Sequence, residues 1–197
     1  MNDKEWIGKG YNKKVNIIYE LNNNINGKGK EYDDGILKFE GEYLNGKRNG
    51  KGKEYYYFNG ELKFEGQYLN GKRSGKGKEY HYNGRLAFEG EFLNGEKIRE
   101  GKDYNEKGEL RFEGEYLYDC KVKGKYYINE KLEYEGEYFY DKKWNGKGYD
   151  KNGNIIYELI NGNGKAKEYW NNDKLSFEGE YLNGKRNGKG KEYLLLW

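Results

Sequence analysis

The sequence predicts an all-β protein, built as an elongated antiparallel sheet of about eight stacked β-hairpins. Three observations lead to this prediction: an aromatic and glycine motif that recurs along the chain, a period-two pattern inside each copy, and Asn-Gly pairs between the extended stretches. The composition agrees, because 31 glycines and no proline favour turns built on residues that tolerate positive φ. We therefore expect strands and turns, with no helix.

A block with the sequence Phe-Glu-Gly-Glu-Tyr, or a variant of it, recurs every 20 to 25 residues. Its copies begin at Tyr19, Phe39, Phe64, Phe88, Phe112, Tyr134, Tyr157 and Phe177. Residues 1–18 are expected to form a partial first hairpin, and the whole chain, 1–197, a single array. In such a solenoid each unit buries its aromatic face only by stacking on its neighbours. Residues 17–21 and 155–159 are identical, which indicates duplication of a larger block.

Within the copy that starts at Phe39, alternation predicts a strand with two different faces. Phe39, Gly41 and Tyr43 share one face, and Glu40 and Glu42 share the other. An Asn-Gly pair, which is a strong hairpin signal, then leads into a stretch of alternating lysines. We expect a ladder of Glu and Lys on the solvated face, so the two acids are predicted to be structural and not a catalytic pair.

Charge and rare residues narrow the possible functions. The 37 basic and 34 acidic residues leave a net charge of only +3, so no nucleic-acid partner is expected. His81 and Cys120 are the only residues of their kinds, and neither a zinc cluster nor a Cys-His catalytic pair can be assembled from them. We expect no enzyme activity, no catalytic residues, no metal and no cofactor. The single cysteine favours a cytoplasmic location.

These residues resemble the MORN (membrane occupation and recognition nexus) repeat. The resemblance is carried by the Phe-Glu-Gly-Glu-Tyr block, the Asn-Gly turn and the Gly-Lys-Gly run, and is closest in the copies at Phe39, Phe64 and Phe177. It implies a twisted antiparallel sheet with a grooved aromatic face. It also implies a place among cytoskeletal, membrane-junction or signalling proteins. The copies at Phe88 and Phe112 lack parts of the turn motif, so their hairpin tips are expected to differ in shape.

The leading hypothesis is a non-enzymatic scaffold that binds a protein segment or a second copy of the chain through the aromatic groove or a sheet edge. The groove would be lined by the second aromatic residue of each block. The protein-binding candidates are therefore Tyr43, Tyr68, Phe92, Tyr116, Tyr138 and Tyr181.

Basic pairs at the predicted hairpin tips suggest an alternative function. Equivalent residues of a stacked array fall along one edge, where a row of cations could bind acidic phospholipid headgroups. The candidates are Lys47, Arg48, Lys72, Arg73, Lys185 and Arg186. The competing explanation is that these charges only keep sheet edges soluble and unpaired. Either binding function would allow a peripheral position at a membrane or the cytoskeleton.

The last four residues, Leu194 to Trp197, depart from the repeat with the sequence Leu-Leu-Leu-Trp. An apolar final strand invites pairing at a sheet edge. Three explanations are open: a cap folded onto the last hairpin, a dimer contact, or the end of a truncated array.

Overall fold

The described part of the chain contains strands and turns only. The structure, a computed structural model, describes residues 8–11, 17–21, 26–170, 172 and 174–194. These residues form 17 strands and no helix, which confirms the predicted fold class. In this part of the chain there is accordingly no helix that could span a membrane. The chain divides into two compact units, Met1–Glu96 and Lys97–Trp197.

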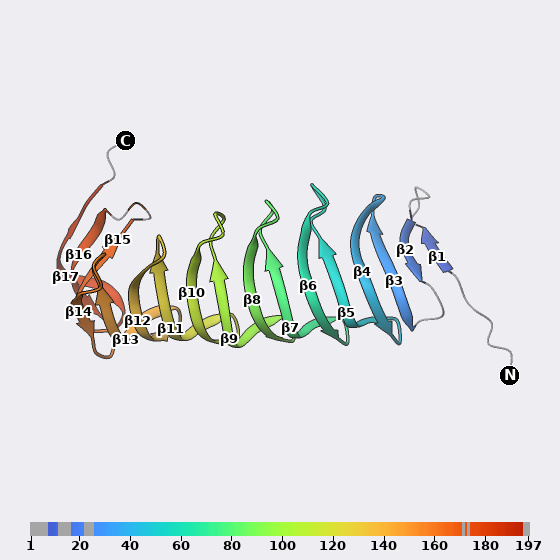
Figure 1. Ribbon diagram of the computed structural model, residues 1–197. Helices are drawn as coiled ribbons and strands as arrows, with labels where there is room; N and C mark the ends of the chain where they lie inside the picture. Colours follow the sequence, from blue (N-terminus) through green and yellow to red (C-terminus); the bar gives the residue numbers. More distant parts are fainter. Residues whose placement is uncertain (1–7, 12–16, 22–25, 171, 173, 195–197) are drawn as a thin grey trace. The chain divides into compact units, whose positions relative to one another are not determined.

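Strands of the first unit pair in chain order, each antiparallel to the next (Figure 1). They are β1 (Gly8–Tyr11), β2 (Ile17–Leu21), β3 (Gly27–Asp33), β4 (Ile36–Leu44), β5 (Lys47–Tyr55), β6 (Leu62–Leu69), β7 (Lys72–Tyr80) and β8 (Leu86–Leu93). The copies that begin at Phe39 and Phe64 are the hairpins β4–β5 and β6–β7, as the repeat predicts.

The second unit holds one run of paired strands and a separate three-stranded sheet. The run comprises β9 (Glu96–Tyr104), β10 (Leu110–Leu117), β11 (Cys120–Ile128), β12 (Lys131–Phe139), β13 (Lys142–Tyr149) and β14 (Ile155–Leu159). The separate sheet comprises β15 (Gly164–Tyr169), β16 (Leu175–Leu182) and β17 (Lys185–Glu192). β9 starts one residue before the boundary of the unit.

The first aromatic residue of each block forms the core. Five of these rings have no exposed surface: Phe39, Phe64, Phe88, Phe112 and Tyr134. The ring of Phe39 lies over Gly41 and Gly52, which face each other across β4 and β5. A Cβ atom on Gly52 would lie 2.5 Å from Cζ of Phe39. Glycine therefore serves packing here, since any side chain would displace the ring.

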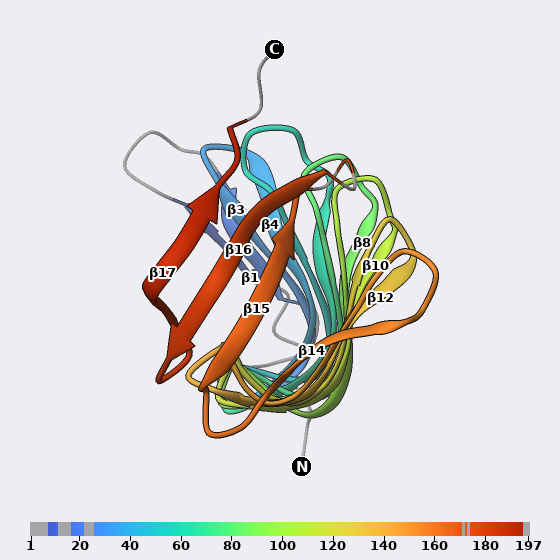
Figure 2. The ribbon, with the colours of Figure 1, turned by 90° about the vertical axis from the view of Figure 1, so that its left-hand side faces the viewer.

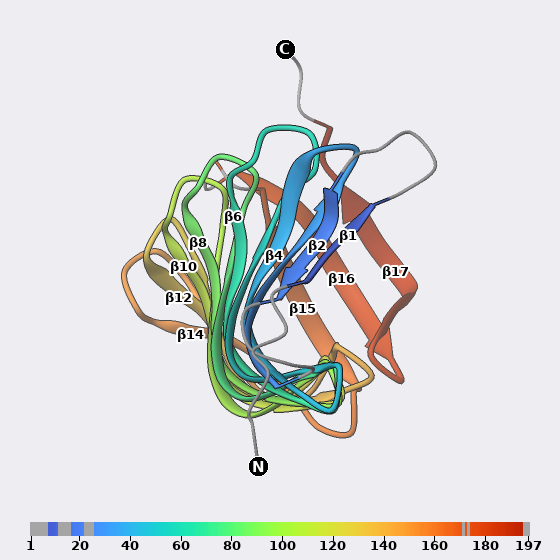
Figure 3. The same ribbon diagram turned by 90° about the vertical axis from the view of Figure 1, so that its right-hand side faces the viewer.

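A β-bulge follows the tip of the hairpin β4–β5. The ladder shifts between Gly41 and Tyr43, and Gly50 has a φ of 79° inside the extra segment of β5. Bulges bend the strand that carries them, and Figure 3 shows β4 and β6 curving along their length. The shift also places Tyr43 opposite Arg48, so the second aromatic residue and the tip arginine lie side by side.

Hairpin tips keep one backbone shape even where the sequence changes. Asn45 and Gly46 have φ values of 52° and 72°, as a type I′ turn requires. Tyr118 and Asp119 hold nearly the same values, 50° and 65°, and Arg99 has a φ of 55° at the bulge position of its own hairpin. The expectation that these tips differ in shape is therefore wrong for the two-residue turn, but the ladder beside the Phe112 tip does differ. Tyr116 faces Lys121, three residues before Gly124, whereas Tyr43 faces Arg48, four residues before Gly52. Strand pairing on both sides imposes the turn, and residues other than glycine bear the strain.

The sheet is interrupted between β14 and β15, although the repeat predicts a hairpin from Tyr157 (Figure 2). A single isolated bridge replaces the ladder there. The hairpins β4–β5, β6–β7, β10–β11, β12–β13 and β16–β17 bring two glycines together at the centre of the ladder, whereas Leu159 and Ala166 occupy those positions in this copy. Both side chains are buried, with 1% and 3% of their surface exposed. Two side chains thus stand where two glycines meet in those hairpins, and β15 starts a second sheet.

Both ends of the chain lie largely outside the described residues. In the partial first hairpin, residues 8–11 and 17–18 are described. At the other end Leu194 is described and is 85% exposed, while residues 195–197 lie outside the description. The three explanations of the terminal segment therefore stay predictions.

Candidate interaction surfaces

The second aromatic residue of each block, the predicted protein contact, lies within the packing of the sheet. Three of these rings are buried and three are partly buried: Tyr68, Phe92 and Tyr116 form the first group, and Tyr43, Tyr138 and Tyr181 the second. Tyr68 stands edge-on to Phe64 of its own block, with ring centroids 5.6 Å apart, and to Phe39 of the preceding block at 5.1 Å. Rings in such contacts hold neighbouring hairpins together and offer a partner little area.

The arginines of the basic tips lie over the aromatic core. In Arg48, Arg73 and Arg186 the guanidinium carbon is 4.0, 4.1 and 4.3 Å from the centroid of the first aromatic ring of the same block. A guanidinium at this distance from a ring face makes a favourable cation–π contact. These three arginines, which the sequence predicted as lipid contacts, therefore pack against the aromatic core of the protein itself.

In the first unit, glutamates two strands away or on the same strand pair with these arginines and link the hairpins. Arg48 Nη2 donates to Glu31 Oε2 at 2.6 Å, from β5 to β3. Arg73 Nη2 donates to Glu54 Oε2 at 2.7 Å, and its Nη1 donates to Glu79 Oε1 at 2.6 Å. Glu54 also lies 3.4 Å from Arg48. Alternating charges thus run across β3, β5 and β7; we call this set of five residues the charge row.

Tyrosine hydroxyls complete the charge row. The hydroxyl of Tyr43 donates to Glu31 at 2.6 Å, and that of Tyr68 donates to Glu54 at 2.7 Å. Burial alone would raise the pKa of Glu54, but the hydrogen bond and charge of Arg73 bring that pKa below its usual range. The sequence analysis did not predict that these glutamates pair with the tip arginines. Strand register could have indicated it, because Glu54 faces Phe39 across the ladder and so lies on the aromatic side of the sheet.

A family model described as the MORN repeat matches residues 39–57, 64–84 and 177–194. The chain contains three MORN repeats. They coincide with the hairpins β4–β5, β6–β7 and β16–β17, whose tips share the sequence Asn-Gly-Lys-Arg. MORN repeats often take part in protein or membrane interactions. No curated protein matches the chain.

Leucine and lysine, rather than arginine, are the exposed side chains at the hairpin tips that follow β4, β6 and β8 in the first unit. Leu44, Leu69 and Leu93 are 48%, 55% and 40% exposed, and Lys47 and Lys72 are exposed beside the first two. Backbone hydrogen bonds of 2.8 and 2.9 Å join consecutive tips. These five side chains form what we call the tip strip. Sequence reasoning missed its leucines, although each directly precedes an Asn-Gly pair.

Lysine takes the place of the tip arginine in one hairpin of the second unit. Lys143 Nζ donates to both carboxylate oxygens of Glu133, at 2.8 and 2.6 Å, and lies 5.0 Å from the ring centroid of Tyr134. Glu133 is only 5% exposed. The hydroxyl of Tyr157 donates to the same carboxylate at 3.2 Å. A cation over the first ring therefore persists with a shorter side chain, but its carboxylate comes from the residue before that ring in the same hairpin.

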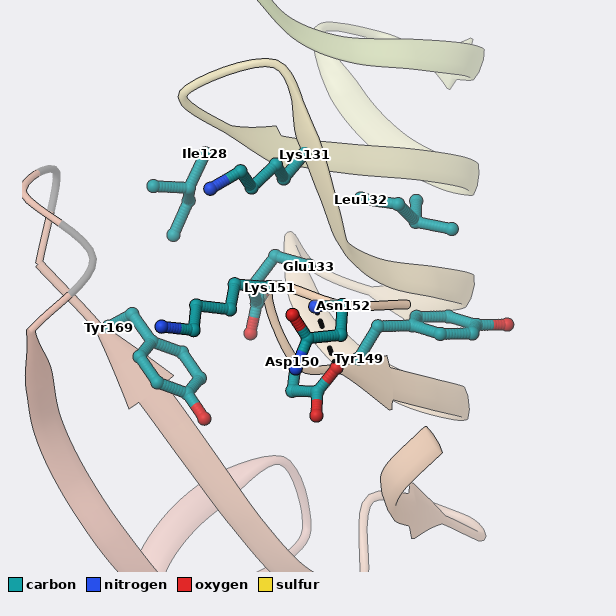
Figure 4. Close-up of a pocket in the computed structure, with 9 residues that line it drawn as sticks. All are labelled: Ile128, Lys131, Leu132, Glu133, Tyr149, Asp150, Lys151, Asn152 and Tyr169. Atoms are coloured by element: carbon teal, nitrogen blue, oxygen red, sulfur yellow. Dashed lines mark hydrogen bonds between the residues drawn. The ribbon is translucent and has the colours of Figure 1, made fainter. Parts of the chain in front are cut away.

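Glu133 of this ion pair also lines a cavity of about 260 Å³ (Figure 4). Its lining residues are Ile128, Lys131, Leu132, Glu133, Tyr149, Asp150, Lys151, Asn152 and Tyr169. Glu133 is already paired with Lys143, and Asp150 accepts hydrogen bonds from the backbone of Asn152 and Asn154. With two lysines and two carboxylates, the lining has no dominant charge.

The face opposite the aromatic core of the MORN repeats carries the predicted ladder of Glu and Lys, which is confirmed. Lys30 Nζ lies 3.3 Å from Glu40, and Lys53 Nζ lies 3.9 Å from Glu65 of the next hairpin. The backbone N–H of Lys51 donates to Glu42 at 3.1 Å. Both acids of the Phe39 block thus have structural contacts. In the described part of the chain there is no cluster of three or more His, Cys, Asp or Glu that could hold a metal.

Proposed function

We propose that the chain is a non-enzymatic scaffold that binds a protein partner, with the tip strip of the first unit as a binding surface. The observation that carries this proposal is the row of three equivalent leucines, each between 40% and 55% exposed. Single exposed leucines are common on protein surfaces, but here they recur at equivalent positions of successive hairpins, beside lysines at the first two, and apolar residues rimmed by charge are typical of an interaction site. The presence of MORN repeats supports the same class of function.

Binding to an acidic membrane is the second candidate function, because lysines border the leucines. The arginines argue against it, since Arg48 and Arg73 are each engaged by two carboxylates and a ring. Lys47 and Lys72 then remain as the exposed basic pair of these tips. At roughly 1 kcal/mol for each charge near an anionic surface, they supply about 2 kcal/mol, which gives only marginal attachment.

Affinity purification with quantitative mass spectrometry tests the protein proposal. The test variant replaces Leu44, Leu69 and Leu93 by Ser, and the matched control replaces Leu117 and Leu182, which are 54% and 48% exposed at the same repeat position in the second unit. A partner bound by the wild type and by the control should be lost from the test variant. Equal capture by all three proteins would contradict the tip strip as a binding surface.

Sedimentation with phosphatidylserine vesicles over a series of salt concentrations tests the membrane alternative. We expect little binding at physiological ionic strength. Strong, salt-sensitive binding that disappears when Lys47 and Lys72 are replaced by Ser would favour the membrane function instead, because attraction between exposed charges is screened by salt.

A further inference from the structure

Two neighbouring loops of the first unit present aromatic side chains to solvent. Residues 56–61 join β5 to β6 and residues 81–85 join β7 to β8, at the opposite end of these strands from the tip strip. Tyr57, Phe58 and Tyr82 are 70%, 57% and 52% exposed. We call these three side chains the loop rings.

Hydrogen bonds hold the two loops side by side. The hydroxyl of Tyr56 donates to the backbone carbonyl of Tyr80 at 2.7 Å. The side-chain Nδ2 of Asn59 donates to the carbonyl of Tyr82 at 2.8 Å. Within the first loop, the N–H of Tyr56 donates to the carbonyl of Glu61 at 2.9 Å. The loop rings therefore stand on a braced backbone, and little conformational freedom is lost when a partner binds them.

Folding does not require aromatic residues in such a loop. In residues 81–85 the N–H of His81 donates to the carbonyl of Arg85 at 2.8 Å, and the N–H of Gly84 donates to that of His81 at 2.9 Å. The loop of residues 105–109 in the second unit makes the same two bonds, at 3.0 and 2.9 Å, with the sequence Asn-Glu-Lys-Gly-Glu. Because a polar loop closes in the same way, exposed rings at this position indicate a contact outside the chain.

We propose that the loop rings bind a proline-rich segment of another protein in the polyproline II conformation. Such segments dock on surfaces lined by aromatic rings. Their backbone forms no internal hydrogen bonds, so their carbonyl groups can accept from exposed donors. Tyr57 supplies both a ring and a hydroxyl donor on an exposed side chain. This chain contains no proline, so neither it nor a second copy can provide the segment.

The spacing of the two loops favours this conformation over a strand or a helix. The loops are two strands apart in the sheet, which corresponds to about 9.4–9.8 Å (Figure 1). In polyproline II, residues i and i+3 share a face and lie about 9.3 Å apart. Residues on one face of a strand repeat at about 6.6 Å, and those on one face of a helix, i and i+7, at about 10.5 Å. A segment with proline at every third position therefore reaches both loops.

Charge and ring geometry favour a neutral, compact side chain such as proline. Glu61 and Arg85 leave the two loops without net charge. Attachment to an anionic membrane would draw on an excess of cations, which these loops lack. The rings of Tyr57 and Phe58 stand at 87° to each other, with centroids 5.4 Å apart. They thus form a corner, into which the rigid five-membered ring of proline can pack.

Fluorescence anisotropy with a labelled peptide of five Pro-Ala-Leu repeats tests the proposal on the full chain. We expect saturable binding of this peptide. A peptide of the same composition with its five prolines in one run should bind about tenfold more weakly, because it does not present a proline and leucine repeat to both loops. Absence of saturable binding, or equal binding of the two peptides, would overturn the proposal.

Paired variants locate the site. Replacing Tyr57 and Phe58 together by Ser should weaken peptide binding at least about tenfold, since buried aromatic contacts dominate binding energies. The matched control replaces Tyr118 and Tyr140 by Ser, which removes rings that are 56% and 74% exposed at tips of the second unit. The control should bind the peptide as the wild type does. Full binding by the first variant, or an equal loss in both, would refute the assignment to the loop rings.

Two further measurements test other occupants of the loop rings. The free chain should sediment as a monomer over a concentration series, and a dimer that dissociates in the variant with Ser at 57 and 58 would assign the rings to a second copy. Phosphatidylcholine vesicles should not bind, and binding lost in the same variant would assign the rings to a membrane surface. The tip-strip variant should keep full peptide binding, because its leucines lie at the other end of the strands, so this proposal and the proposed function fail independently.

Discussion

Replacing Glu54 by Gln should destabilise the first unit by about 3 kcal/mol, because it removes one partner from a largely buried ion cluster. Glu54 accepts hydrogen bonds from Arg73 Nη2 and the Tyr68 hydroxyl, both at 2.7 Å, and lies 3.4 Å from Arg48. Hydrogen bonds to charged groups contribute about 1.5–3 kcal/mol each. The glutamine amide keeps one acceptor oxygen, but its NH₂ group is itself a donor and would face the donor groups of Arg73 and Tyr68. Since 17% of the side chain is exposed, water offsets part of the loss.

Glu192→Gln is the matched control, because residues 185–193 repeat the sequence of 47–55, with Glu192 at the position of Glu54, but the side chain of Glu192 is 67% exposed. An exposed pair contributes less than about 1 kcal/mol. Denaturant unfolding followed by circular dichroism gives the loss of stability, and hydrogen-exchange mass spectrometry assigns it to β5–β7 or to β16–β17. Losses of equal size in the two variants would refute the reasoning that the charge row stabilises the first unit.

Two more predictions concern the same hairpins. Gly52→Ala should cost about 1–3 kcal/mol in thermal or denaturant unfolding, because the new methyl group meets the fully buried ring of Phe39. The cost should shrink in a Phe39→Leu background, and an unchanged cost would disprove the steric cause. Because the folded pKa of Glu54 lies below its ordinary value of 4.5, the stability that it contributes is complete above about pH 4.5 and is lost as the pH falls through the folded value. Unfolding midpoints over an acid series should therefore fall more steeply in the wild type than in Glu54→Gln, and parallel curves would contradict this.

Repetition made the fold predictable from the sequence. Alternation separates Phe39 and Gly41 from Glu40, and the structure places the first two on the aromatic side of the sheet. The Asn-Gly pairs mark the tips because both residues tolerate positive φ. Where the motif is lost, as at Tyr118 and Asp119, the turn survives, since the ladders beside it determine the backbone.

The interruption of the sheet could not be read from the motif alone. Residues 17–21 and 155–159 are identical, yet Leu21 pairs with Gly29 in a ladder, whereas Leu159 does not pair with Ala166. The methyl group of Ala166 is one difference between the two copies, and a loop shorter by one residue is another. Whether a sheet accepts a methyl group depends on how closely the backbones meet, which is a property of the packed structure.

The candidate sites show the same division. The sequence by itself determined the hairpin repeat, its two faces and the ladder of Glu and Lys, because all of these depend on local periodicity. Tertiary structure decided that Arg48 and Arg73 bind glutamates of other hairpins and that leucines occupy the exposed tips. Among the described residues it also decided that β5 pairs on both edges, whereas the residues of the same sequence in β17 pair on one. Each of these features depends on which strands lie next to each other. The order of residues within one repeat does not determine side-chain partners two strands away, because those partners meet only when the hairpins stack.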